Sequence, residues 1–180
     1  MTEAKVKLIT GSLLHDIGKV IYRQGIDRRN HSTAGGDYLK DEVGITDRVV
    51  LDCVKYHHAA MLKGAALDDN SLAYIVYLAD NIAAFADRRK KAESDEKGFE
   101  LAVPLQSIFN ILNGNHEEFY YQPGDMGDDN GINYPSAEKK KFSEAFYTKI
   151  RQRLTDNLKG LQWTEEYINS LMAVMEANLT

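Results

Sequence analysis

The chain has 180 residues, of which 43% are hydrophobic and 27% are charged, an ordinary composition for a globular domain with one core. Its single cysteine excludes a disulfide framework and a zinc site built from several thiolates, and it favours a reducing compartment. The formal net charge of -5 argues against a general nucleic-acid coating protein, and without an apolar run of roughly 20 residues we expect a cytoplasmic protein with no membrane contact.

Two helices are predicted before position 45. Apolar residues recur at helical spacing over residues 5–22, so one continuous helix is expected there, with the adjacent His15 and Asp16 in its middle. A second helix is expected from near Ser32 to Gly44, because glycine readily adopts the left-handed backbone conformation that ends a helix.

Two further helices are predicted around a linker at residues 64–70. Thr46 can cap the first of them, which leads into the tandem histidines 57–58. Asn70 or Ser71 can cap the second, which has the clearest helical periodicity in the chain. The residues expected to face the core from this helix are Leu72, Ile75, Val76, Ala79, Ile82, Ala83 and Ala86.

The second half of the chain has weaker periodicity. A short helix is expected at 104–112, a strand of a small hairpin at 117–121, and two longer helices at 136–158 and 164–179. The whole pattern predicts an all-α fold, a helical bundle with a small irregular or hairpin insertion around residues 113–135.

Imidazole and carboxylate side chains are spread over the predicted helices. Four of the five histidines fall between positions 15 and 58, and Asp80 lies at the border of an apolar helix face, where a carboxylate is costly to bury unless it is paired or binds a cation. Such ligands without thiolates suit manganese, nickel, iron, zinc or magnesium, and ions of this kind generate hydroxide and clamp phosphoryl groups. The candidate metal ligands are His15, Asp16, His31, His57, His58 and Asp80. Each histidine taken alone also fits a structural role.

The order of these motifs resembles a known superfamily. HDIGK (His15, Asp16 and Lys19), HSTAGG (His31), HH (His57 and His58) and LADNIAAFADR (Asp80) follow one another as in the HD-domain phosphohydrolases. More narrowly, LLHDIGKVIYR with the two later motifs is similar to the N-terminal HD nuclease domain of the polymerase-like large subunit of type III-A (Csm) CRISPR effector complexes.

This resemblance implies a helical domain that binds one or two divalent ions, such as manganese, nickel or magnesium, and cleaves single-stranded DNA in antiviral defence. His15 and Asp16 would be ligands and catalytic residues, Asp16 bridging two ions, and Lys19 would neutralise the scissile phosphate. The implied partners are the other subunits and the guide RNA of such a complex. We expect one HD-type domain over 1–180, with a motif-bearing core at about 1–92, excised from a longer multidomain chain.

Basic residues near the histidines are candidates for contacts with a DNA strand, namely Arg23, Arg28, Arg29 and Lys63. The sequence departs from many HD phosphohydrolases because no histidine precedes His15. Either a C-terminal segment supplies the missing ligand, or one metal site is incomplete.

Two other functions remain open from the sequence. The first is an HD-family nucleotide or cyclic-dinucleotide phosphohydrolase, although the Gly-Tyr-Pro signature of the cyclic-dinucleotide enzymes is replaced here by AAMLKGAALDD after the tandem histidines. The second is a non-catalytic helical scaffold within a ribonucleoprotein complex.

Overall fold

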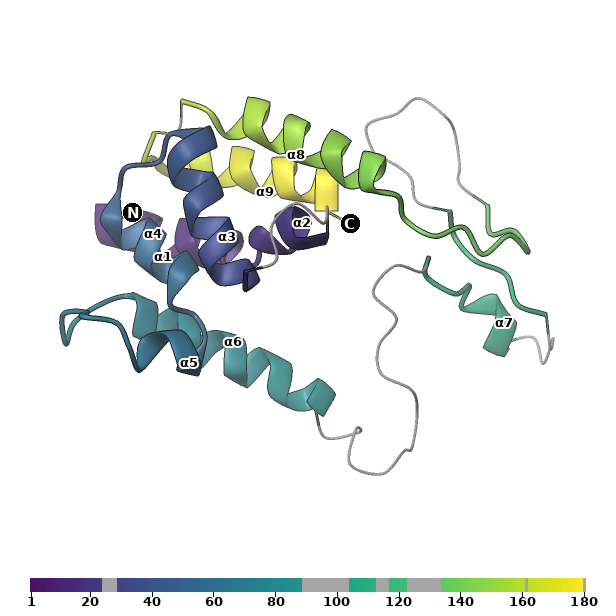
Figure 1. The fold of residues 1–180 in the computed structure, drawn as a ribbon, viewed down its shortest axis with the longest axis horizontal. Helices are drawn as coiled ribbons and strands as arrows, with labels where there is room; N and C mark the ends of the chain where they lie inside the picture. Colours follow the sequence, from purple (N-terminus) through teal and green to yellow (C-terminus); the bar gives the residue numbers. More distant parts are fainter. Residues whose placement is uncertain (24–28, 89–103, 113–116, 123–133, 161, 180) are drawn as a thin grey trace.

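The computed structural model describes residues 1–23, 29–88, 104–112, 117–122, 134–160 and 162–179 (Figure 1). In these residues the regular elements are helices, so the all-α prediction is confirmed. The α-helices are α1 (Glu3–Leu14), α2 (Gly18–Arg23), α3 (His31–Tyr38), α4 (Arg48–Lys55), α5 (Ala59–Leu62), α6 (Ala73–Arg88), α7 (Phe109–Leu112), α8 (Glu144–Leu158) and α9 (Glu165–Leu179). A π-helical segment, η1 (Leu39–Val43), continues α3.

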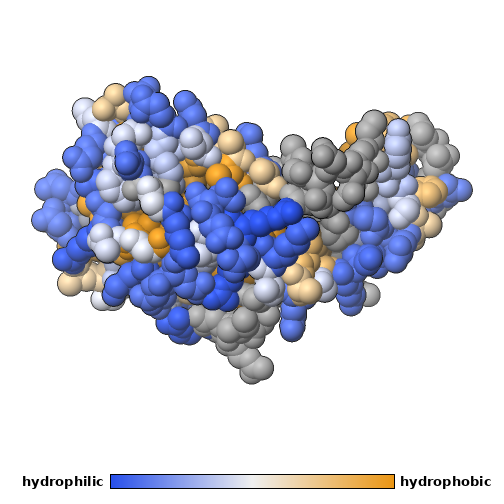
Figure 2. Space-filling model, turned by 90° about the horizontal axis from the view of Figure 1, so that it is seen from above, coloured by the Kyte–Doolittle hydropathy of each residue, from blue (hydrophilic) through white to orange (hydrophobic). Residues whose placement is uncertain are grey.

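The first four α-helices form the centre of a bundle, with α8 and α9 side by side on one side and α6 on the other (Figure 1). The core is apolar and draws on α1 to α4, η1, α8 and α9. Its fully or nearly fully buried side chains include Leu14, Ile17, Leu39, Val50, Val54, Leu154, Leu158 and Leu171. From above, the molecule has a mostly hydrophilic face with small hydrophobic patches (Figure 2). Among the described residues, none of the helices combines the length and apolarity that a bilayer crossing requires.

The predicted helix over residues 5–22 is wrong as one continuous element. Helix α1 ends at Leu14 and α2 begins at Gly18, and a tight turn separates them. In the turn the amide of Ile17 donates to the carbonyl of Leu14 at 3.0 Å. This bond spans three residues, whereas the bonds of an α-helix span four. The change of direction buries Ile17 in the core and places His15 and Asp16 in the turn, not in the middle of a helix.

The start of the second predicted helix is close to the expectation, whereas the cap of the third differs from it. Helix α3 begins at His31, near the expected Ser32, and Asn30 caps it by accepting a hydrogen bond from the amide of Thr33 at 2.8 Å. Asp47, not Thr46, caps α4 by accepting from the amide of Val50 at 3.2 Å. The predicted end at Gly44 is confirmed, since this residue has a φ of 88° in the left-handed region.

Helix α6 turns a different face to the bundle than its periodicity predicted. Val76 is buried as expected, but Ile75 and Ile82 are 48% and 75% exposed, and Leu78 is 57% exposed. The helix is apolar around most of its circumference, so its periodicity is compatible with more than one buried face. The side that packs against α4 and α1 carries Ala73 and Val76, both buried.

The expected hairpin is reduced to single bridges where the structure describes it. Tyr120 pairs in antiparallel fashion with Gln106 and with Ser136, and neither pairing extends into a strand. Residues 113–116 and 123–133 of the predicted insertion lie outside the described residues. The helix expected from 136 begins only at Glu144, where the side chain of Ser143 caps it. The single-domain organisation with a core at about 1–92 stays a prediction.

Candidate metal centre

The candidate ligands are brought together from turns and helix ends. His15 and Asp16 lie in the turn between α1 and α2, and His31 is the first residue of α3. His57 and His58 lie between the end of α4 and the start of α5, and Asp80 lies within α6. The packing of α2 against α3, α3 against α4 and α4 against α6 brings these side chains, which are distant in sequence, close together.

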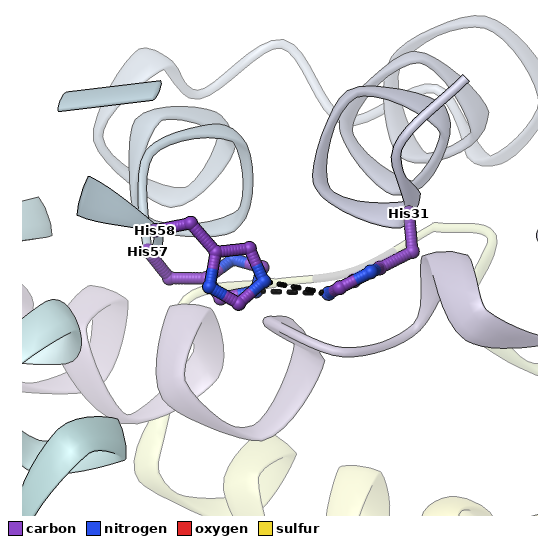
Figure 3. A group of neighbouring side chains, drawn as sticks. All are labelled: His31, His57 and His58. Carbon is purple, nitrogen blue, oxygen red and sulfur yellow. Dashed lines mark hydrogen bonds between the residues drawn. The ribbon is translucent and has the colours of Figure 1, made fainter. Parts of the chain in front are cut away.

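Three imidazole rings form the centre of the site (Figure 3). The Nε2 atom of His31 lies 2.9 Å from that of His58 and 3.3 Å from that of His57. The three residues each offer a ring nitrogen within 4.8 Å of the others. His57 is fully buried, whereas His31 is about a quarter exposed at 23%, so the group is open to solvent on the His31 side.

Backbone carbonyls orient two of the rings. The Nδ1 atom of His57 lies 2.7 Å from the carbonyl oxygen of Val54, and that of His15 lies 2.7 Å from the carbonyl oxygen of Ser12. A carbonyl can only accept, so in each ring Nδ1–H donates and the neutral ring keeps its lone pair on Nε2. This is the arrangement that metal-binding histidines use to fix tautomer and direction.

Asp16 contacts the histidines with both of its carboxylate oxygens. Its Oδ1 lies 3.2 Å from His31 Nε2 and 3.8 Å from His57 Nε2. Its Oδ2 lies 3.4 Å from His15 Nε2 and accepts a hydrogen bond from Lys19 Nζ. Asp16 therefore links His15 to His31 and His57, and the rings of His15 and His57 also meet edge to face with their centroids 5.0 Å apart.

Asp80 lies at the edge of this arrangement. Its Oδ1 is 3.7 Å from His15 Nε2, and its side chain is 25% exposed. The structure thus places Asp80 beside His15 of the site.

The electrostatic environment separates the pKa values of these groups. Burial favours neutral Asp16, but hydrogen bonds with His15, His31 and Lys19 outweigh it and hold the pKa of Asp16 well below its usual range. Burial disfavours charged His15, yet its contacts with Asp16 and the Ser12 carbonyl raise its pKa overall. Burial, aided by the charge of His58, lowers the pKa of His57 to about 4. Burial and the neighbouring His31 lower the pKa of His58.

These residues fit a divalent cation. Two nitrogen ligands that each lie about 2.1 Å from one ion are about 3.0 to 3.4 Å apart at octahedral or tetrahedral angles. Of the observed separations from His31 Nε2, 3.3 Å lies in this range and 2.9 Å lies just below it. The lowered pKa values of His57 and His58 favour neutral imidazoles, and the lowered pKa of Asp16 favours a charged carboxylate, which are the protonation states that metal binding requires.

The structure places only part of the predicted DNA-binding set. Arg29 Nη1 donates to Asp37 Oδ2 at 2.7 Å, and Lys63 is exposed at the end of α5. The chain segments that carry Arg29 and Lys63 are in contact, because the side chain of Asn30 donates a hydrogen bond to Met61 Sδ at 3.5 Å. Arg28 lies outside the described residues, as does the side chain of Arg23, the last residue of α2.

Sequence reasoning missed the residue that holds His31. Asn30 Oδ1 accepts hydrogen bonds from the hydroxyl of Ser32 and the amide of Thr33, both at 2.8 Å, and so sets the first turn of α3. An asparagine directly before His-Ser-Thr was the available signal for this cap. Whether a C-terminal segment supplies the ligand missing before His15, or one metal site is incomplete, stays a prediction.

Comparisons with known proteins show which proteins this chain resembles. Residues 1–84 match the family model described as HD domain. Similar proteins include a Streptococcus thermophilus protein that is 35% identical over 185 residues and an Enterococcus italicus protein that is 32% identical over 194 residues. Both are named CRISPR system single-strand-specific deoxyribonuclease Cas10/Csm1 (subtype III-A). The matches cover 100% and 97% of this chain but only 24% and 26% of those proteins.

Solved structures share the fold at lower identity. Csm1 of T. onnurineus superposes with a TM-score of 0.67 at 23% identity, covering 100% of this chain and 24% of that one. A Csm1 chain from a Csm1-Csm4 subcomplex of a type III-A interference complex superposes with a TM-score of 0.63 at 24% identity, covering 97% of this chain and 24% of that one. The chain thus spans about a quarter of the length of the relatives it matches.

Proposed function

We propose that this chain, which carries an HD domain and belongs with the Cas10/Csm1 proteins of type III-A CRISPR systems, hydrolyses phosphodiester bonds of single-stranded DNA with the help of divalent metal ions. The observation that carries the proposal is the convergence of the histidine Nε2 atoms around both oxygens of Asp16. The names of the relatives, single-strand-specific deoxyribonucleases, support the choice of substrate.

The proposed ligands divide around Asp16. We assign Asp16 to the bridging position because its Oδ1 faces His31 and His57 while its Oδ2 faces His15. His31, His57 and His58 would hold one ion, and His15 with Asp80 would hold a second. When bound, divalent ions of the manganese, nickel or magnesium type supply a water with a lowered pKa and neutralise phosphoryl charge.

Lys19 has two roles in this proposal. Its Nζ donates to Asp16 Oδ2, so in the metal-free protein it compensates part of the charge of that carboxylate. Its side chain is 48% exposed, so the ammonium group can turn from Asp16 to an oxygen of an incoming phosphate. Lys19 would then bind the scissile phosphate while His15 and Asp16 hold the reacting centre in place.

The strand is proposed to approach from the open side of the site. His57 is fully buried, whereas His31, Asp16 and Lys19 are partly exposed, which gives the site one accessible face. We assign Arg29 and Lys63, which are close in sequence to the contacting residues Asn30 and Met61, to the flanking phosphates. Arg23 and Arg28 are assigned to the same role from the sequence alone.

The proposed setting is type III CRISPR antiviral defence in the cytoplasm. Since the chain spans about a quarter of the length of its relatives, we propose that it acts as the nuclease part of a longer protein. That protein would assemble with other Csm subunits, as the similar Csm1 chains do with Csm4. We propose a guide RNA as a further partner from the resemblance of the sequence motifs.

The test is a cleavage assay on labelled single-stranded DNA, duplex DNA, RNA and nucleotides, each with manganese and with a chelator. We expect manganese-dependent cleavage of single-stranded DNA that is lost in the double variant His15→Ala with Asp16→Ala. Asp69→Ala, an exposed carboxylate outside the site, serves as the matched control and should cleave like the parent.

Other outcomes point to the other functions. Hydrolysis of nucleotides or cyclic dinucleotides without cleavage of any strand would identify a small-molecule phosphohydrolase. Cleavage by the double variant at the parental rate would refute the site assignment. Inactivity on every substrate, together with no effect of manganese on the melting temperature, would identify a scaffold.

A further inference from the structure

Gly18 lies where the turn that carries Asp16 meets the helix that carries His31. A Cβ atom built on Gly18 would lie 1.8 Å from the carbonyl oxygen of His31 and 2.7 Å from its carbonyl carbon. It would also lie 2.7 Å from the amide nitrogen of Gly35. All three neighbours are backbone atoms of α3, which cannot rotate away as the end of a side chain can.

On the α3 side of this contact lies a second glycine, Gly35. A Cβ atom on Gly35 would lie 2.9 Å from the nitrogen and 3.1 Å from the Cα of Gly18. It would lie 3.3 Å from Cγ2 of Ile17, a buried core residue. The two helices therefore touch backbone to backbone, which only residues without a Cβ permit.

The contact has a direct consequence for the candidate ligands. Asp16 is two residues before Gly18, and the carbonyl that Gly18 abuts belongs to His31 itself. The distance between Asp16 Oδ1 and His31 Nε2, 3.2 Å, is thus set across this backbone contact. Any side chain at position 18 must push the start of α3 away from the turn or tilt α2.

We propose that Gly18 is a positioning residue that holds Asp16 within ligating distance of His31. The inference rests on the proposed metal centre and deepens it, because it names the contact that holds the turn with Asp16 at a fixed position relative to His31. Gly18 contacts neither metal nor substrate. It acts through the backbone of His31, and Gly35 completes the contact from the α3 side.

The experiment measures binding of Co²⁺ alone, by its visible absorption spectrum and by calorimetry, to the whole chain and three variants. Gly18→Ala should keep its helical circular dichroism but bind Co²⁺ at least about tenfold more weakly, with a changed absorption spectrum, as when an orienting group is lost from a metal site. Gly35→Ala, with milder contacts of 2.9 to 3.3 Å, should show a smaller loss of the same kind.

Leu171→Ala is the matched control for loss of stability, since it opens a cavity in the core from α9. It should lower the melting temperature while leaving the Co²⁺ affinity within about twofold of the parent, because local ligand geometry is unchanged. Parental affinity and spectrum in Gly18→Ala would overturn the positioning role. An equal loss of affinity in Leu171→Ala would overturn it as well.

Two further results are decisive. If Gly18→Ala does not fold, Gly35→Ala carries the test, and parental Co²⁺ binding by Gly35→Ala would overturn the inference. If the parent itself binds no Co²⁺, the metal centre is refuted and the positioning role with it. Failure of the proposed function is thereby distinguished from failure of the role of Gly18.

Discussion

The Nε2 atoms of His31 and His58 lie 2.9 Å apart, although the two residues are separated by 27 positions in the chain. Two neutral imidazoles that point their lone pairs at each other repel, so this contact needs either a proton or a cation between the two nitrogens. A third ring nitrogen with a lone pair lies at the same point. It is His57 Nε2, which is 3.3 Å from His31 Nε2 and whose ring is oriented by the Val54 carbonyl. A divalent cation satisfies all three at once.

Manganese is therefore expected to stabilise the folded chain. A ligand that binds only the native state at 100 times its Kd raises the free energy of unfolding by about 2.7 kcal/mol. We expect the melting temperature to rise with added Mn²⁺ and the rise to be largely lost in His58→Ala. Differential scanning calorimetry with and without a chelator measures it. An unchanged manganese effect in His58→Ala would remove this residue from the ligand set.

Replacing Lys19 should change metal binding and cleavage in opposite directions. The ammonium group of Lys19 occupies Asp16 Oδ2 in the metal-free protein and competes with a cation for that oxygen. Lys19→Met should thus bind Mn²⁺ a few-fold more tightly, yet cleave single-stranded DNA roughly 10- to 100-fold more slowly if Lys19 binds the scissile phosphate.

The control for this pair of measurements is Lys40→Met, which removes an exposed lysine of η1 away from the candidate ligands. Calorimetric titration gives the affinity and a gel assay at saturating manganese gives the rate. A slower rate combined with weaker metal binding would show that Lys19 supports the ligands and has no separate role toward the phosphate.

The metal-free chain should lose stability as the pH falls from about 6.5 toward 4. The pKa of His57 is lowered from an ordinary 6.5 to about 4, so in this window the unfolded chain binds a proton that the native chain does not. The contribution of His57 is complete above pH 6.5 and lost as the pH falls through this window. His58, whose pKa is also lowered, acts in the same direction.

The other shifted groups of the site do not change in that window. His15 has a raised pKa, so its contribution is constant below its ordinary pKa of 6.5, and that of Asp16 is lost only below 3.8. Chemical unfolding in chelator at several pH values measures the effect, which we expect to reach at most about 3 kcal/mol. His57→Asn, which can keep a donor toward the Val54 carbonyl, should flatten the curve, and a parental slope in this variant would contradict the assignment.

The two faces of α6 should respond differently to substitution. Val76 is 2% exposed, so Val76→Ala should reduce the free energy of unfolding by about 1 to 3 kcal/mol. Ile82 is 75% exposed, so Ile82→Gln should change it by less than about 0.5 kcal/mol in this chain. Urea unfolding of both variants measures the difference. A large loss in Ile82→Gln would mean that this side chain is covered in solution.

Much of the fold was predictable from local pattern. The helices predicted before Gly44 correspond to α1, α2 and α3, and those predicted at the C-terminus correspond to α8 and α9. Some of their first and last residues differ from the predicted ones. Caps were missed where two candidates were adjacent in sequence, as with Thr46 and Asp47, because the choice depends on which side chain reaches the amide of Val50. The short helix α5 after His58 had too few residues for a periodic signal.

The candidate site was predictable in its chemistry but not in its geometry. The sequence by itself determined the residue types, since four histidines with Asp16 and Asp80 supply imidazole and carboxylate donors without thiolates. Only the tertiary structure decided that His15 and Asp16 leave the helix in a turn, that Lys19 pairs with Asp16, and that Asp80 lies next to His15. Periodicity indicates which apolar residues can share a helix face. A turn, the face that a helix buries and the 3.2 Å approach of Asp16 Oδ1 to His31 Nε2 depend instead on which backbones can touch. At this site the backbone contact depends on the absence of a Cβ atom at Gly18.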